Sequence, residues 1–248
     1  MGKLTGKRAL VTGGAQGIGM GIALGFIDEG ADVMIMDIKP PDSEMFSKAA
    51  SEKGRVALFR EGSVANEIDV KRVVTDALSI LGGLDILVCN AGIVSESPAM
   101  DLTLEEWNRV LAVNLTGVFL CCRTVLPSMV AQGHGRIINM ASQLGQIGGD
   151  QMTHYSASKA GVIGYTKALS REVSAQNILV NAIAPGPIMT EMLENESDTW
   201  LARKLADLPM ARFGSVAEVV PTAIFLASDD STYFTGQTLG PNGGDVML

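Results

Sequence analysis

A glycine-rich turn between two apolar strands limits this chain to a small set of folds. The pattern predicts a strand at Arg8–Thr12, a glycine turn at 13–19, a helix to about Glu29 and a second buried strand at Asp32–Asp37. These elements form a βαβ unit of the length typical of nucleotide binding. The glycines let the backbone approach a pyrophosphate, and the helix N-terminus adds amide donors and the positive end of a dipole. The turn therefore predicts a dinucleotide site.

An acidic residue at the end of the second strand indicates which dinucleotide is bound. Asp37 lies eighteen residues after Gly19, close to the ~20 expected of an acid that accepts hydrogen bonds from the adenosine ribose. Its charge would repel a 2′-phosphate, and the glycine turn holds no basic residue. NAD is therefore predicted over NADP, although Lys39 could partly screen the carboxylate.

Strand and helix patterns continue to alternate to the end of the chain. Further strands are expected at 56–60, 84–89, 135–140, 178–184 and 237–239, and helices at 42–53, 65–81, within 104–130, at 152–176 and at 216–227. Such alternation predicts an α/β fold, with a doubly wound parallel sheet of about seven strands and helices on both faces. We expect a single domain over residues 1–248. Ligands in such sheets bind beyond the carboxyl ends of the strands.

One segment interrupts the alternation. Residues 189–208 have a helical pattern rich in Met, Leu and acidic residues, directly after the turn Pro185-Gly186-Pro187. An insertion at the ligand edge of a sheet is often a lid or a substrate wall. The pattern fits a substrate lid at about 188–210, and it fits an additional packing helix equally well.

Charge and cysteine usage exclude several classes of partner. The net charge of −8 and the pI of about 4.8 argue against binding to nucleic acid or to an anionic membrane surface. No apolar run approaches the ~20 residues of a membrane span. Cys89, Cys121 and Cys122 are odd in number and lack metal-ligand spacing, which is typical of a reducing compartment. We expect a cytoplasmic protein with no metal site.

A tyrosine and a lysine share one face of the helix expected at 152–176. Tyr155 and Lys159 are four residues apart, which places them one turn apart. A nearby positive charge favours the phenolate and moves the tyrosine pKa down from about 10 towards working pH. On its own the pair would more often be structural than catalytic. Next to a dinucleotide site, it suggests acid–base chemistry.

Several motifs in order make the whole chain resemble the short-chain dehydrogenase/reductase family. The matching residues are Thr12-Gly13-Gly14-Ala15-Gln16-Gly17-Ile18-Gly19, Asn90-Ala91-Gly92, Asn114, Ser142, Tyr155-Ser156-Ala157-Ser158-Lys159, Asn181 and Pro185-Gly186. Each motif is weak alone, but their joint occurrence in this order is specific. The resemblance implies a Rossmann-type fold, a nicotinamide cofactor and hydride transfer to or from a carbonyl carbon. It also implies a homotetramer with the Tyr155 helix on one interface.

The resemblance assigns roles to four catalytic residues. Tyr155 would exchange the alcohol proton, and Lys159 would lower its pKa and hold the nicotinamide ribose. Ser142 would hydrogen-bond the substrate oxygen, and Asn114 would anchor a water in a proton relay behind Lys159. Without the resemblance, Ser142 would be interpreted as a cap or turn residue after a strand, and Asn114 as a residue that forms a local hydrogen bond within a helix.

The cofactor and substrate sites are predicted residue by residue. The cofactor-binding residues are Gly13, Gln16, Gly17, Ile18, Gly19, Asp37, Ile38, Ser63, Val64, Asn90, Ala91, Gly92, Tyr155, Lys159, Pro185, Gly186, Ile188 and Thr190. Ser63 replaces the Asp that usually faces the adenine in this family. The candidate substrate residues are Gln143, Gln146, Gln151, His154, Met189 and Trp200. Their amides and apolar groups suggest a hydroxylated substrate with an apolar side.

Three functions fit these motifs. The first is an NAD(H)-dependent oxidoreductase that interconverts a secondary alcohol, such as a polyol or sugar, and its ketone. The second is a 3-oxoacyl-thioester (acyl-carrier-protein) reductase, a role that normally pairs with NADP and with basic patches for an acidic carrier. Asp37 and the net charge of −8 count against it. The third is a non-catalytic NAD-binding sensor, which would not need Ser142, Tyr155 and Lys159.

Overall fold

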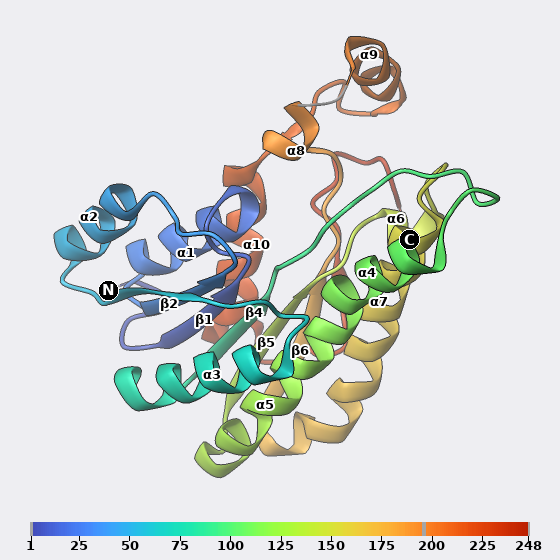
Figure 1. Ribbon diagram of the computed structural model, residues 1–248. Coiled ribbons are helices and arrows are strands. Elements are labelled where there is room, and N and C mark those ends of the chain that lie inside the picture. The colour runs from blue at the N-terminus through green and yellow to red at the C-terminus, as the bar shows by residue number, and fades with distance from the viewer. Residues whose placement is uncertain (1, 195–196, 248) are drawn as a thin grey trace.

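The computed structural model describes residues 2–194 and 197–247, and its centre is a seven-stranded parallel sheet (Figure 1). The strand order is β3-β2-β1-β4-β5-β6-β9. The strands are β1 (Arg8–Thr12), β2 (Asp32–Asp37), β3 (Ala57–Glu61), β4 (Ile86–Cys89), β5 (Gly135–Met140), β6 (Ile178–Ile183) and β9 (Thr238–Leu239). The chain winds outwards from β1 to β3 on one side and from β4 to β9 on the other. Because the winding reverses between β1 and β4, a ligand crevice is expected there.

Helices cover both faces of the sheet, as the sequence predicts. Buried side chains of α3 (Glu67–Leu81), α5 (Gly117–Gln132) and α7 (Thr153–Val173) form a core cluster on one face. The other face is covered by α1 (Gly17–Asp28), α2 (Ser43–Lys53) and α10 (Val216–Ala227). Two clusters of this kind define the doubly wound, Rossmann-type architecture and confirm the predicted fold class.

The helical region at 104–130 is not one regular helix. It consists of α4 (Leu104–Leu111), a π-helical turn η1 (Ala112–Thr116) and α5, with Pro127 inside α5. Among the described residues, the stretch Leu104–Gln132 is the one long and apolar enough to cross a membrane. Core helices pass the same test, and α5 packs its apolar residues against the sheet. The stretch is therefore weak evidence for a membrane span.

The segment at 189–208 is also interrupted. Met189 ends the short strand β7 (Ile188–Met189), which pairs with β8 (Gly214–Ser215). Two helices follow, α8 (Glu191–Glu194) and α9 (Asp198–Asp207), and they project above the carboxyl edge of the sheet (Figure 1). The expected single helix is wrong because Met189 is held in a strand pair and Ser197 is extended, with its hydroxyl capping α9.

Candidate active site

Hydrogen bonds join the turns after β1 and β4, between which the strand order of the sheet reverses. The Asn90 side chain donates to the carbonyls of Thr12 at 3.1 Å and Gly13 at 2.8 Å. The Thr12 hydroxyl in turn accepts from the amides of Asn90 at 3.1 Å and Ala91 at 3.2 Å. A Cβ on Gly13 would lie 2.6 Å from the Cα of Ala91, so only glycine allows this approach. The predicted glycine and Asn90-Ala91-Gly92 motifs therefore meet.

The glycine turn leaves space for a ligand at the start of α1. Gly17 has a φ of +55°, and a Cβ there would meet only the Cγ2 of Thr190, at 3.8 Å. The N-cap residue Gln16 makes no side-chain capping bond, so the first amides of α1 are not capped by it. An open cradle of amides at a helix N-terminus fits a pyrophosphate. Thr190, predicted to contact the cofactor, lies across the cradle from Gly17.

Asp37 lies at the edge of the same crevice. Its Oδ2 accepts from the Ala15 amide at 3.0 Å, and its Oδ1 accepts from the Lys39 amide at 3.3 Å. Each carboxylate oxygen has a second lone pair, so both can still accept from a ribose hydroxyl. The two amide contacts hold the carboxylate in the position that the sequence predicts for it.

A cavity of about 460 Å³ extends the crevice beyond Asp37. It is lined by Ile38, Glu61, Gly62, Ser63, Asp69 and Arg72. Ile38 and Ser63 were predicted here, whereas the charged residues were missed. Asp69 and Arg72 could have been found from their place in the sequence. They lie in the first turns of α3, and α3 begins at the carboxyl edge of the sheet, where ligands bind. The Arg72 guanidinium donates to the Glu61 carbonyl at 2.6 Å and to Asp69 at 3.1 Å.

Ser142, Tyr155 and Lys159 converge on the other side of the crevice. Ser142 follows β5, and the other two residues lie on α7. The Nζ of Lys159 is 5.8 Å from the centre of the Tyr155 ring and donates to the Met140 carbonyl at 2.7 Å. A Cβ on Gly92 would lie 3.4 Å from the same Nζ. The Tyr–Lys pair and the cofactor loops therefore share one site.

The pKa values of the pair differ from the expectation. Burial raises the pKa of the Tyr155 phenol above its ordinary value, and hydrogen bonding with Ser142 offsets part of this rise. Burial lowers the pKa of Lys159 to about 8. The expected lowering of the tyrosine pKa by the ammonium is not found, because desolvation dominates and Lys159 is bonded to the Met140 carbonyl.

Asn114 lies behind the pair, in the π-helical turn, and is fully buried. Its Oδ1 accepts from the Ile93 amide at 2.8 Å, and its Nδ2 donates to the Ile93 carbonyl at 2.9 Å and to the Ser158 hydroxyl at 3.2 Å. Both amide hydrogens are therefore used within the protein. Asn114 fixes the loop after β4, and its predicted role in holding a water stays a prediction.

The remaining predicted cofactor residues surround the crevice at different depths. The Pro185 carbonyl accepts from the Gln143 amide at 3.2 Å, and the Gly186 amide donates to the Pro241 carbonyl at 3.1 Å. Ile188 is buried. Val64 is also buried, where a Cβ on Gly117 would come within 2.8 Å of it. Val64 therefore packs under the crevice, and Pro185 and Gly186 connect it to the C-terminal tail.

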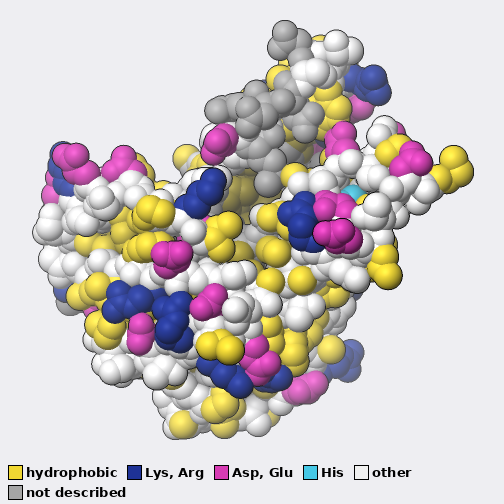
Figure 2. Space-filling view, viewed as in Figure 1, with side chains coloured by type: hydrophobic (Ala, Val, Ile, Leu, Met, Phe, Trp, Pro, Cys, Tyr) yellow, Lys and Arg dark blue, Asp and Glu magenta, His cyan; other side chains and the backbone are white. Residues whose placement is uncertain are grey.

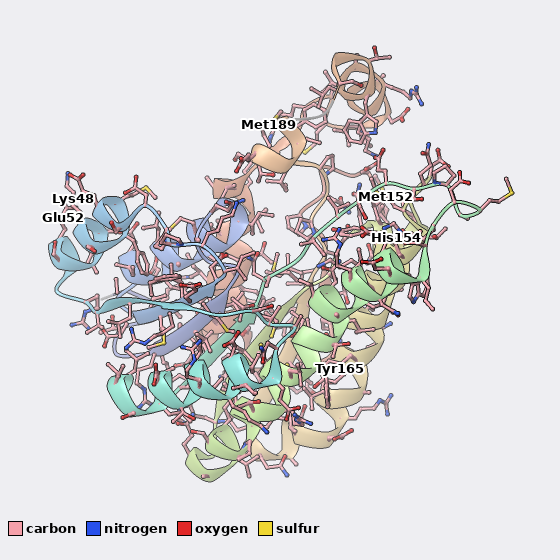
Figure 3. The ribbon with its side chains drawn as sticks, in the orientation of Figure 1. Lys48, Glu52, Met152, His154, Tyr165 and Met189 are labelled. Carbon is pink, nitrogen blue, oxygen red and sulfur yellow. The ribbon has the colours of Figure 1, made fainter. Side chains whose placement is uncertain are left out.

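The candidate substrate residues do not all face one space. Met189 is 38% exposed near α8 (Figure 3), and Trp200 is half-buried on α9. His154 is fully buried, and its Nε2 is bonded to the Ser95 hydroxyl at 2.8 Å. The helical step from Tyr155 turns His154 towards α4. These contacts therefore do not place His154, a predicted substrate residue, in the substrate site.

The surface above the site is hollowed below the projecting α8 and α9, and hydrophobic side chains gather in the hollow (Figure 2). A glycine-lined crevice at the reversal of a parallel sheet, with a half-buried tyrosine and a buried lysine at its side, defines a dinucleotide-dependent oxidoreductase. A family profile described as Enoyl-(Acyl carrier protein) reductase matches residues 13–245. The chain belongs to the short-chain dehydrogenase/reductase family, which binds a nicotinamide cofactor, and it is an oxidoreductase acting on CH–OH groups.

The similar proteins cover nearly the whole chain. The 3-oxoacyl-[acyl-carrier-protein] reductase FabG of Staphylococcus aureus is 40% identical over 242 residues, which are 97% of this chain and 98% of the relative. FabG of Thermotoga maritima is 40% identical over 246 residues, 99% of this chain and 100% of the relative. The solved structure of a putative short-chain alcohol dehydrogenase from Sinorhizobium meliloti has a TM-score of 0.92 at 35% identity, covering 98% of this chain and 97% of that one.

Proposed function

We propose that this protein reduces a 3-oxoacyl thioester to its 3-hydroxy form with a nicotinamide cofactor. The observation that supports this most is the 40% identity to 3-oxoacyl-[acyl-carrier-protein] reductases over almost the full length of both chains. The residue pattern alone favoured a polyol or sugar dehydrogenase. The comparisons support the thioester reductase better than that first choice.

The site residues are arranged for a carbonyl reduction. The bound nicotinamide would supply the hydride to C3. Ser142 would donate a hydrogen bond to the substrate oxygen as negative charge develops on it. Tyr155 would transfer its phenolic proton to that oxygen, and Lys159 would stabilise the resulting phenolate. The raised pKa of Tyr155 keeps the phenol protonated at neutral pH, as a donor must be, and it also makes the phenol a weaker acid.

The proposed cofactor is NAD(H). The Asp37 carboxylate, held by two backbone amides, would accept hydrogen bonds from the ribose hydroxyls and repel a 2′-phosphate. The Arg72 guanidinium in the adjoining cavity would favour NADP. Because Arg72 already donates to Glu61 and Asp69, we expect Asp37 to decide the preference.

The second candidate is an NAD-dependent dehydrogenase of a secondary alcohol. Asp37 supports it, because NAD suits oxidation in cells, and so do the amides of Gln143 and Gln146 near Ser142. The net charge of −8 also disfavours docking of an acidic carrier protein. The similar solved structure, described as a putative short-chain alcohol dehydrogenase, also favours this candidate.

A substrate panel separates the candidates. Acetoacetyl thioesters, simple ketones, and polyols or secondary alcohols are assayed with both NAD(H) and NADP(H), in the appropriate direction, by nicotinamide absorbance. The proposal predicts the highest kcat/KM for an acetoacetyl thioester with NADH. A clear preference for a polyol would favour the second candidate, and a strong NADPH preference would overturn the role given to Asp37. Cofactor binding without turnover of any substrate would indicate a sensor.

A further inference from the structure

A small polar cluster joins three distant segments next to Ser142. The Oδ2 of Asp245, in the C-terminal tail, accepts from the Nε2 of Gln143 at 2.5 Å and from the Nζ of Lys204 at 2.5 Å. Gln143 follows Ser142, and Lys204 lies on α9. Figure 1 shows the C-terminal end of the described chain beside α6 (Leu144–Ile147), with α9 above the sheet edge. Asp245 therefore connects the loop after β5 to the projecting helix.

The carboxylate fixes the direction of the Gln143 amide. The Gln143 residue is 3% exposed, and the side chains of Asp245 and Lys204 are 9% and 22% exposed. An amide can present either its NH₂ group or its oxygen to a neighbour. The Asp245 oxygen attracts Nε2 and would repel Oε1, and the Lys204 ammonium pairs with the same carboxylate oxygen at 2.5 Å. Nε2 therefore faces Asp245, and Oε1 must face away from it.

The Oε1 of Gln143 is left as a free acceptor. It is closed off from solvent and has no hydrogen-bond partner in the described part of the chain. The backbone of Gln143 is fixed, because its amide donates to the Pro185 carbonyl at 3.2 Å and its carbonyl accepts from the Gln146 amide at 2.8 Å. An unpaired buried acceptor is unfavourable, and a ligand that donates to it relieves that penalty.

We propose that Gln143 is a specificity-determining residue whose Oε1 accepts a hydrogen bond from an OH or NH group of the substrate near the reacting carbonyl. Asp245, supported by Lys204, is the positioning residue that keeps Oε1 available. The inference rests on the proposed function, in which Ser142 binds the carbonyl oxygen. A site that pairs a buried acceptor with a substrate donor discriminates strongly, because an analogue without the donor leaves the acceptor unpaired.

The donor has two chemical sources, and paired probes distinguish them. Hydroxyacetone and butanone differ by a hydroxyl in place of a methyl group on the carbon next to the carbonyl. The N-acetylcysteamine thioester of acetoacetate carries an amide N–H, which its S-butyl thioester analogue lacks. Binding of each probe to the enzyme loaded with NAD⁺ is measured by isothermal titration calorimetry, because a ketone carbonyl cannot accept a hydride from the oxidised cofactor. Unchanged nicotinamide absorbance verifies that the hydroxyl of hydroxyacetone is not oxidised during the titration. We expect the donor-bearing member of one pair to bind about tenfold more tightly.

Two substitutions test whether Gln143 and Asp245 produce this preference. Gln143→Met keeps the length of the side chain and removes the acceptor. Asp245→Asn introduces an amide that can donate to Oε1. The side-chain amide of Gln143 can then rotate so that Oε1 accepts this hydrogen bond and is no longer unpaired. Both variants should bind the paired probes with nearly equal affinity, while the probe without a donor keeps its wild-type affinity. Asp230→Asn, which breaks an exposed ion pair with Lys3, is the matched control and should keep the preference.

The outcomes separate this inference from the proposed reaction. A donor preference that both variants abolish supports the assignment, even if wild-type protein turns over neither probe, and in that case the proposed reaction fails alone. Wild-type protein that binds both members of each pair equally, or binds none, overturns the assignment. So does a preference that survives in Gln143→Met. If Asp245→Asn is poorly folded by circular dichroism, Lys204→Met replaces it, because loss of the ammonium also loosens Asp245.

Discussion

At the scale of single residues, burial opposes charge on both members of the Tyr155–Lys159 pair. Desolvation raises the pKa of Tyr155 and lowers that of Lys159 to about 8. Because the Lys159 pKa is lowered, the ammonium persists below about pH 8 and is lost as the pH rises through that value. At neutral pH the pair is therefore a neutral phenol next to an ammonium. This combination suits an acid that gives its proton to a ketone oxygen.

Removal of the Tyr155 hydroxyl tests that role. In Tyr155→Phe the ring still packs in the site, but no proton donor is left. We expect kcat for ketone reduction to fall by about 10²- to 10⁴-fold, while the Kd for NADH from a fluorescence titration stays within about twofold. Thr153→Ala, at an exposed position on the same helix, is the control. A Tyr155→Phe variant with nearly wild-type turnover would exclude Tyr155 as the acid.

At the scale of elements, local sequence patterns were sufficient where one apolar run fills one strand or helix. Four elements begin and end where the sequence predicts: the strands Arg8–Thr12, Asp32–Asp37 and Gly135–Met140, and the helix Val216–Ala227. Each has an apolar pattern with clear polar or glycine boundaries. The irregular elements were missed because distant contacts hold them. The Asn114 side chain binds Ile93, and Met189 pairs with Ser215.

The same distinction applies to the site. The glycine turn, Asp37, Tyr155 and Lys159 could be found from spacing, because the chemistry of each depends on near neighbours in the sequence. The Gln143–Asp245 bond joins residues 102 positions apart, and His154 is fixed by Ser95, 59 positions away. Contacts of this kind follow from the packing of whole elements, so no local pattern predicts them.

The π-helical turn between α4 and α5 makes a prediction of its own. Asn114→Ala leaves the Ile93 amide and carbonyl without their side-chain partner in a buried place. We expect a loss of about 1–3 kcal/mol in the free energy of unfolding, measured by urea denaturation followed by circular dichroism. Asn114→Asp keeps an acceptor for the Ile93 amide but loses both donors. It should also destabilise the protein.

Asn108 supplies the matched control for this experiment. It lies one and a half turns earlier on α4 and is exposed, so Asn108→Ala should leave the unfolding midpoint nearly unchanged. If Asn114→Ala unfolds at the same urea concentration as the control, the turn does not depend on this side chain. Asn114 would then be retained for a different reason, such as the predicted water contact.

At the scale of the whole molecule, an ion-pair network secures the end of the sheet opposite the proposed site. Asp85, just before β4, accepts from the Arg8 amide at 2.8 Å and from its guanidinium at 2.7 and 2.9 Å, and it bonds His134 at 2.5 Å. Burial acts to raise the pKa of Asp85, but the bonds from Arg8 and His134 outweigh it and hold the pKa at about 2. Three segments of the chain depend on this one carboxylate.

The lowered pKa of Asp85 makes stability depend on pH in a definite window. The unfolded carboxyl ionises near its ordinary value of 3.8, so the stabilisation is complete above about pH 4 and is lost as the pH falls towards 2. Its size is roughly 2 kcal/mol. We expect Asp85→Asn to destabilise the protein at pH 7 and to lose less stability than wild type between pH 5 and pH 2. Urea unfolding across this range measures both effects, and Asp101→Asn, at an exposed site, is the control.

The outer face of α7 makes the last prediction, which concerns assembly. Ala157, Ala160 and Gly164 are exposed along one side of the helix, and a Cβ on Gly164 would meet nothing within 4 Å. Next to them on α5, Phe119 is 40% exposed and stacks edge-on with Tyr165 at 6.5 Å. Small residues allow helices to approach closely, and exposed apolar rings favour a covered interface.

We therefore expect a homotetramer in which this face of α7 packs against a second copy. Gly164→Arg places a long charged side chain where two helices would meet, and it should convert the tetramer into a smaller species by size-exclusion chromatography with light scattering. Ser51→Arg, at an exposed site on α2, should leave the mass unchanged. A Gly164→Arg variant with the wild-type mass would place the interface elsewhere. Because Tyr155 lies on the same helix, loss of assembly should also lower kcat more than the Kd for NADH changes.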